Sequence, residues 1–149
     1  MRFPTGLLLL ALLTGCESTS FSDRLATVPP QVQMVDGDTE TVYRAAQKAF
    51  KRLDFNVTRS TMGRVEAASM IKTSETFGDS RQTVARVRIT EAEPGKCSVE
   101  LSVTEEVGSS SMGGTRQQAL REHSFFPLYF AMLQQVLQEA AMDRAAEKK

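Results

Sequence analysis

The chain has 149 residues, the length of one domain, and its 18 basic and 18 acidic residues leave no net charge. This balance argues against nucleic-acid binding, because counterion release from phosphates needs an excess of Lys and Arg. Apolar residues make up 41% of the chain, enough for a hydrophobic core, whereas its single histidine, His123, cannot build a metal site by itself.

Residues 1–16 contain the three parts of a secretory signal peptide in the required order. Arg2 supplies the positive charge, Leu7–Leu13 form the apolar run, and Thr14-Gly15 are the small residues before a cleavage site. A membrane-spanning helix needs about 20 apolar residues, so this run is too short to span a bilayer. We therefore expect residues 1–15 to be a signal peptide that is removed.

The end of this segment, Leu13-Thr14-Gly15-Cys16, resembles the lipobox of bacterial lipoproteins. The resemblance implies cleavage by signal peptidase II and a Cys16 that carries an S-diacylglycerol and an N-acyl chain such as palmitate. Two or three acyl chains give a stable membrane anchor, whereas one chain binds reversibly. Gram-negative lipoproteins with Asp after the cysteine tend to stay at the inner membrane. Glu17 stands here, which by resemblance favours the outer membrane, facing the periplasm.

Residues 16–30 are predicted to be a lipidated N-terminus and a flexible tether, because they are rich in Ser and Thr and end in Pro29-Pro30. At about 3.3 Å per residue, the tether could hold the domain up to roughly 45 Å from the bilayer. A single domain is expected over residues 31–143, followed by a charged tail at 144–149. An ordinary signal peptide with a cysteine nearby is the alternative to this arrangement.

The domain is predicted to begin with a candidate strand at Gln31–Val35 and a helix capped by Asp38. Apolar residues then recur at helical spacing, which predicts one buried stripe. The stripe consists of Val42, Ala45, Ala46, Ala49, Phe50 and Leu53.

Four strand candidates follow, at Phe55–Ser60, Arg64–Lys72, Gln82–Thr90 and Cys97–Val107. The last two alternate strictly, as in an antiparallel sheet with one wet face. A turn at Pro94-Gly95 predicts a register that opposes Arg88 to Glu100, Ile89 to Val99, Val87 to Leu101 and Ala85 to Val103. The residues expected on the inner face of the second candidate are Val65, Ala67 and Ile71. Those expected on the wet face are Arg64, Glu66, Lys72, Arg86, Arg88 and Glu100.

A Gly- and Ser-rich segment at Gly108–Thr115 is predicted to be a mobile loop, and a final helix to start near Ser124. The apolar stripe of this helix is Phe126, Tyr129, Phe130, Leu133, Val136, Leu137 and Ala140. Two amphipathic helices and a sheet with one buried and one solvent-exposed face predict an α+β two-layer sandwich. In it, about four antiparallel strands, with the N-terminal strand as a candidate fifth, are covered on one face by two helices. Its element order is similar to small helix-grip modules, including those of the C-type lipoprotein of the outer-membrane β-barrel assembly machine, and to uncharacterised small envelope lipoproteins.

No group of residues in the sequence has the pattern of a catalytic, cofactor or metal site. Cys97 alternates with inward residues and is expected to be buried and free; a disulfide with Cys16 is the alternative. Glu105 and Glu106 would point to opposite faces of a strand. The serines at 109–111 lack a nucleophile elbow, and residues 113–116 lack the lysine of a P-loop. We therefore expect neither an enzyme nor a bound cofactor.

Two kinds of function remain for a domain of this type. The first is a membrane-anchored structural or protein-interaction module of the cell envelope, with an envelope protein as partner. The second is a carrier of a small apolar ligand or lipid, with a cavity between the last helix and the sheet. Such a cavity would be lined by Phe125, Phe126, Phe130 and Met132.

Overall fold

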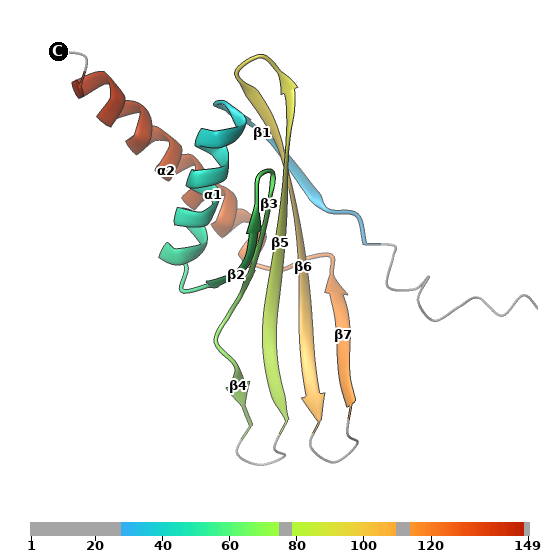
Figure 1. Cartoon of the computed structure of the whole chain (residues 1–149). Coiled ribbons are helices and arrows are strands. Elements are labelled where there is room, and N and C mark those ends of the chain that lie inside the picture. Colours follow the sequence, from blue (N-terminus) through green and yellow to red (C-terminus); the bar gives the residue numbers. More distant parts are fainter. Residues whose placement is uncertain (1–27, 75–78, 110–113, 148–149) are drawn as a thin grey trace, which may run out of the picture.

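The computed structural model describes residues 28–74, 79–109 and 114–147, so the predicted signal segment, Cys16 and most of the predicted tether lie outside the described residues. Seven strands form one antiparallel sheet, and two helices pack against one of its faces (Figure 1). The predicted α+β class is confirmed. The elements are β1 (Gln31–Asp36), α1 (Thr39–Arg52), β2 (Asn56–Thr61), β3 (Arg64–Ala68), β4 (Lys72–Thr73), β5 (Ser80–Glu93), β6 (Lys96–Ser109), β7 (Gly114–Leu120) and α2 (Phe125–Glu147).

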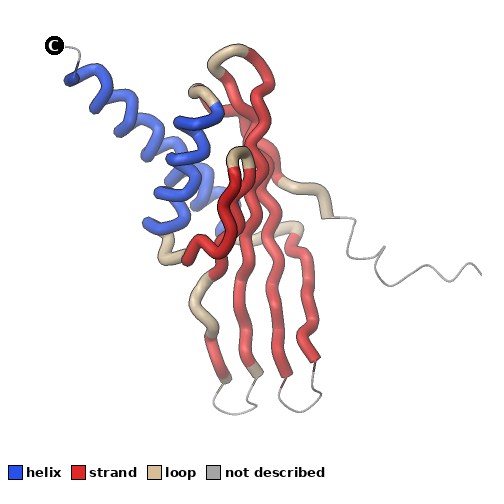
Figure 2. Tube along the Cα trace, in the orientation of Figure 1, coloured by secondary structure: helices blue, strands red, loops and turns tan. Residues whose placement is uncertain are grey.

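Strands β5 and β6 are the longest strands of the sheet. Each has 14 residues and extends over about 45 Å. In the upper half of Figure 1 the strand order is β1-β6-β5-β3-β2. In the lower half β4 pairs with β5 and β7 pairs with β6. Figure 2 shows that the helices cover the upper half only. The sheet is therefore larger than the predicted four or five strands, and its lower half extends past the helices.

The predicted register of the β5–β6 hairpin is confirmed residue by residue. Arg88 lies opposite Glu100, and the apolar pairs are Ile89 with Val99, Val87 with Leu101 and Ala85 with Val103. The register shifts by one only between Glu91 and Glu93, beside the turn, where Gly95 adopts a φ of 77°. A bulge at this place leaves the rest of the ladder in phase.

Helix α1 begins where the sequence predicts, after the N-cap Asp38. The Oδ1 atom of Asp38 accepts a hydrogen bond of 2.8 Å from the Thr41 N–H, which satisfies one of the free donors of the first turn. After the C-cap, Asp54 has a φ of 60°, the left-handed conformation that ends many helices. The predicted stripe is buried, with Leu53 partly covered.

Helix α2 starts at Phe125, next to the predicted start at Ser124. The Nδ1 atom of His123 accepts a hydrogen bond of 3.1 Å from the Phe125 N–H, so His123 satisfies a donor of the first turn. The helix continues to Glu147, into the residues expected to form a charged tail.

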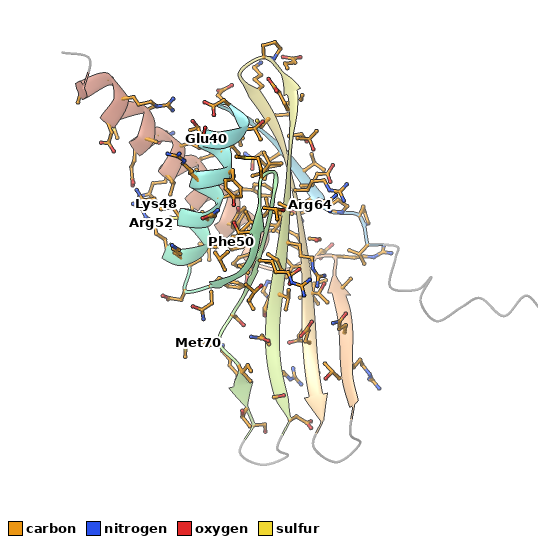
Figure 3. All side chains as sticks on the ribbon, viewed as in Figure 1. Glu40, Lys48, Phe50, Arg52, Arg64 and Met70 are labelled. Carbon is orange, nitrogen blue, oxygen red and sulfur yellow. The ribbon has the colours of Figure 1, made fainter. Side chains whose placement is uncertain are left out.

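The core lies between the helices and the upper half of the sheet. Figure 3 shows Phe50 of α1 in this layer, whereas Arg64 lies on the sheet. Cys97 is fully buried there and free, as predicted. The strand residues of the core are Val35, Val65, Ala67, Ala85, Val87, Ile89, Cys97, Val99, Leu101 and Val103.

The lower half of the sheet contains the clearest departures from the sequence prediction. Ile71, expected on the inner face, is 61% exposed, because the chain leaves the ladder between β3 and β4. When the chain pairs with β5 again in β4, Lys72 lies opposite Arg81, which is a shift of one residue from the β3 register. Lys72 therefore points to the opposite face of the sheet from Arg64. The segment Gly114–Leu120, predicted as loop and connection, is strand β7, because it completes the ladder beside β6.

Candidate functional site

The face of the sheet turned away from the helices carries two rows of directly opposed residues. The upper row runs from β2 to β1 through Thr61, Arg64, Arg88, Glu100 and Val32. The lower row consists of Arg59, Glu66, Arg86 and Ser102, with Pro30 just before β1. We call this surface the open face. Directly opposed residues share a face of the sheet, so the two rows lie side by side.

A hollow of about 620 Å³ lies on the open face and is lined by residues of both rows. Its charged lining consists of four arginines, Arg59, Arg64, Arg86 and Arg88, and two glutamates, Glu66 and Glu100. The hollow therefore has an excess of positive charge in a chain whose net charge is zero. Its volume falls in the range of pockets that hold a small ligand, and the hollow is open to solvent.

The four arginines of the hollow differ in their partners. Arg86 donates through Nε to the Oε2 atom of Glu66 at 2.8 Å. Among the described residues, no carboxylate lies within 4.0 Å of the guanidinium of Arg59, Arg64 or Arg88. Arg88 and Glu100 are thus cross-strand neighbours, as predicted, without forming an ion pair. Three guanidinium groups remain available to a ligand.

A β-bulge in β2 brings Arg59 into the hollow. Val57 lies opposite Ala67, but the next pair is Arg59 with Glu66, so Thr58 is an extra residue. The bulge reverses the alternation of the strand. Without it Arg59 would point toward the helices, as Ser60 does, which hydrogen-bonds to Tyr43 and Gln47 of α1. Simple alternation along Phe55–Ser60 could not reveal Arg59 as a member of this surface.

The other residues considered for chemistry are dispersed. Cys97 is enclosed in the core, where its Sγ lies 3.3 Å from the Gly37 carbonyl oxygen. His123 is exposed and caps α2. Glu105 and Glu106 have separate partners, Arg81 at 3.9 Å and Gln117 at 2.7 Å, in agreement with opposite directions on a strand.

The glycine- and serine-rich segment falls largely outside the described residues. Ser110, Ser111 and Gly113 are not among them, while Gly114, Thr115 and Arg116 are exposed residues of β7. The described part of this segment is a strand that pairs with Val107–Ser109, and nothing in it has the form of a phosphate loop.

The aromatic residues considered as a cavity lining belong to the core. The rings of Phe125 and Phe55 meet at a tilt with their centroids 4.5 Å apart, and the ring centroids of Phe50 and Tyr129 lie 4.6 Å apart. Phe126 and Phe130 are buried and Met132 is partly buried against them. The Tyr129 hydroxyl is buried among these rings without a hydrogen-bond partner in the described chain. Its burial raises the pKa of Tyr129 far above the usual value.

The two helices are joined by a charged cluster on their outer side. Arg52 donates two hydrogen bonds to Glu139, at 2.8 and 2.7 Å, and the Lys48 ammonium lies 3.6 Å from the same carboxylate. The Arg52 hydrogen bond is the main cause that lowers the pKa of Glu139 from 4.5 to about 2. Figure 3 shows Lys48 and Arg52 on the helix layer, away from Arg64. This cluster fixes α1 against α2 and is not part of the hollow.

Comparisons with known proteins identify no family. No family model matches the sequence, and no curated protein matches it. The structure is similar to the adenylate sensor from AMP-activated protein kinase, solved in complex with the ribofuranotide ZMP, with 17% identity and a TM-score of 0.39 over 70% of this chain and 93% of that chain. It is also similar to a DUF4468 family protein from Bacteroides ovatus, with 15% identity and a TM-score of 0.34 over 84% of this chain and 92% of that chain. Similarities at this level transfer no ligand or activity to this chain.

Neither described helix is long and apolar enough to cross a membrane.

Proposed function

We propose that this protein is a lipid-anchored lipoprotein of the bacterial cell envelope whose domain is a protein-interaction or structural module that uses the open face. The observation that carries the proposal is the hollow of about 620 Å³, with three arginines that have no carboxylate partner among the described residues. We propose no enzymatic activity.

The anchor is proposed from the lipobox-like Leu13–Cys16, which lies outside the described residues. Glu17 after the cysteine supports an outer-membrane position facing the periplasm. Pro30, where the tether joins the domain, lines the hollow. The tether therefore meets the domain at the border of the open face, and its roughly 45 Å reach would let this face approach proteins near the membrane.

The alternative function, an apolar carrier, finds less support in the packing. Of the rings that would line a cavity between α2 and the sheet, Phe125 contacts the core residues Phe50 and Phe55, and Phe126 and Phe130 are buried in the same core. Core packing explains these residues without a ligand. The open face is thus the better candidate for a binding surface.

Site-specific photo-crosslinking in the cells that make the protein tests this proposal. A benzophenone amino acid is placed at Thr61 or Val32, which end the upper row, and at Gln138 of α2, an exposed control position on the helix layer. We expect Thr61 and Val32 to give a discrete adduct with one envelope protein and Gln138 to give none. The same adduct from all three positions, or none from Thr61 and Val32, would contradict the proposal.

A further inference from the structure

Two like charges face each other at the centre of the open face. Arg64 of β3 and Arg88 of β5 are directly opposed across the ladder. Like charges in such positions destabilise a sheet, whereas opposite charges stabilise it. The neighbouring pair in the same two strands, Glu66 with Arg86, has opposite charges and is hydrogen-bonded at 2.8 Å. The Arg64–Arg88 pair therefore lacks a structural reason within the described part of the fold.

Nothing in the surrounding rows neutralises this pair. Glu100, on the far side of Arg88, does not come within 4.0 Å of it, and Glu66 is taken by Arg86. The β2 bulge adds Arg59, a further positive charge, to the same hollow. Each guanidinium presents five N–H donors in a planar fork. Together, Arg64 and Arg88 offer paired donors to one oxyanion placed between them.

We propose that the hollow binds an acidic peptide segment of the partner protein, with one carboxylate held between Arg64 and Arg88. This inference rests on the proposed function and names the chemistry of its partner. A carboxylate matches the guanidinium fork with two parallel hydrogen bonds. Its negative charge also offsets the repulsion between the two arginines, so a bound carboxylate stabilises the sheet as well as the complex.

The shape and mixed charge of the hollow favour a peptide over a membrane surface or a lone anion. A flat bilayer surface does not enter a concave site, whereas an extended peptide segment can lie along it. The N–H groups of a peptide can donate hydrogen bonds to the two glutamates and to the hydroxyl oxygen of Ser102. Beside the hollow, Val32 and Met34 of β1 are 58% and 50% exposed, and they give apolar side chains of a peptide a surface to cover.

Binding of a defined probe to the purified full-length chain in detergent tests the proposal. The probe is a fluorescein-labelled peptide in which glutamate alternates with valine, compared with a peptide in which glutamine replaces each glutamate. We expect saturable binding of the first peptide only, measured by fluorescence anisotropy. The double variant Arg64→Gln/Arg88→Gln should weaken binding about tenfold or more, because it removes the charge-assisted hydrogen bonds.

The matched control removes the same charge elsewhere. Arg44→Gln/Arg144→Gln changes two exposed arginines of α1 and α2 and should leave binding unchanged. The Arg64→Gln/Arg88→Gln variant should keep or raise the melting temperature, which excludes unfolding as the cause of lost binding. Equal weakening by both double variants would overturn the proposal, as would binding of phosphatidylglycerol mixed micelles in place of the peptide. If the peptide fails but the Thr61 and Val32 adducts persist in Arg64→Gln/Arg88→Gln, the interaction module stands and only its acidic partner segment is refuted.

Discussion

The replacement Tyr129→Phe should stabilise the domain. Tyr129 is fully buried in α2, and its hydroxyl has no hydrogen-bond partner among the described residues. A hydroxyl buried without a partner costs about 1–3 kcal/mol in proteins. Phe keeps the ring, its contact with Phe50 and its edge-to-face contact with Phe130, whose ring centroids lie 4.6 and 5.9 Å away. The change removes the unsatisfied group and leaves the packing.

The expected gain is about 1–2 kcal/mol in the free energy of unfolding, since a small loss of contact offsets part of the desolvation term. For a domain of this size, each kcal/mol corresponds to about 4 °C in melting temperature. Urea unfolding followed by circular dichroism gives the free energy directly, and a thermal melt gives the shift. An unchanged m-value would show that stability rather than compactness has changed.

Tyr43→Phe is the matched control, because the Tyr43 hydroxyl is hydrogen-bonded to Ser60. Removal of the Tyr43 hydroxyl should leave the free energy of unfolding unchanged or lower it by up to about 1 kcal/mol. If Tyr129→Phe instead destabilises the domain by about 1 kcal/mol or more, the buried hydroxyl has a partner, such as an internal water, and the reasoning is wrong.

Three further predictions test the packing. Cys97 should react slowly with a thiol reagent in the native domain and rapidly in urea, because it is fully buried; rapid native labelling would contradict the core assignment. The folded pKa of Glu139 is lowered to about 2, so its ionised form stabilises the fold above pH 4.5 and this contribution is lost as the pH falls toward 2. Glu139→Gln should therefore flatten the pH dependence of the melting temperature between about pH 5 and 2, and a curve parallel to that of the parent chain would refute the role of the cluster. Deletion of the chain after Ser124 should abolish the cooperative melt, because α2 supplies Phe125, Phe126, Tyr129, Phe130, Leu133 and Val136 to the core.

Local pattern was enough to predict the helix-covered half of the fold. The spacing of Val42 to Leu53 identified α1 and its buried side, and the strict alternation of β5 and β6 identified both their inner face and their register. These features depend on neighbours in sequence or across one short turn. The same alternation placed Arg64, Arg86 and Arg88 correctly on one face together with Glu66 and Glu100.

The lower half of the sheet and part of the hollow could not be predicted in this way. The break between β3 and β4 and the Thr58 bulge each change the phase of a strand by one residue, which moves Lys72 and Arg59 to faces opposite to those that simple alternation gives. Strand β7 has no apolar alternation, because no helix covers it, and its order comes from pairing with β6. Such features depend on tertiary pairing, for which a single sequence carries little signal.

Metabolic labelling with a radioactive or alkyne-bearing palmitate is the most direct test of the central claim that this chain is a lipid-anchored envelope protein. The full chain should incorporate the label and fractionate with the membrane, and Cys16→Ala should abolish both and leave an uncut precursor. Cys97→Ser, a change at the other cysteine of the chain, should be labelled and processed normally. If Cys16→Ala is still acylated and cleaved like the parent chain, the anchor assigned to Cys16 is wrong.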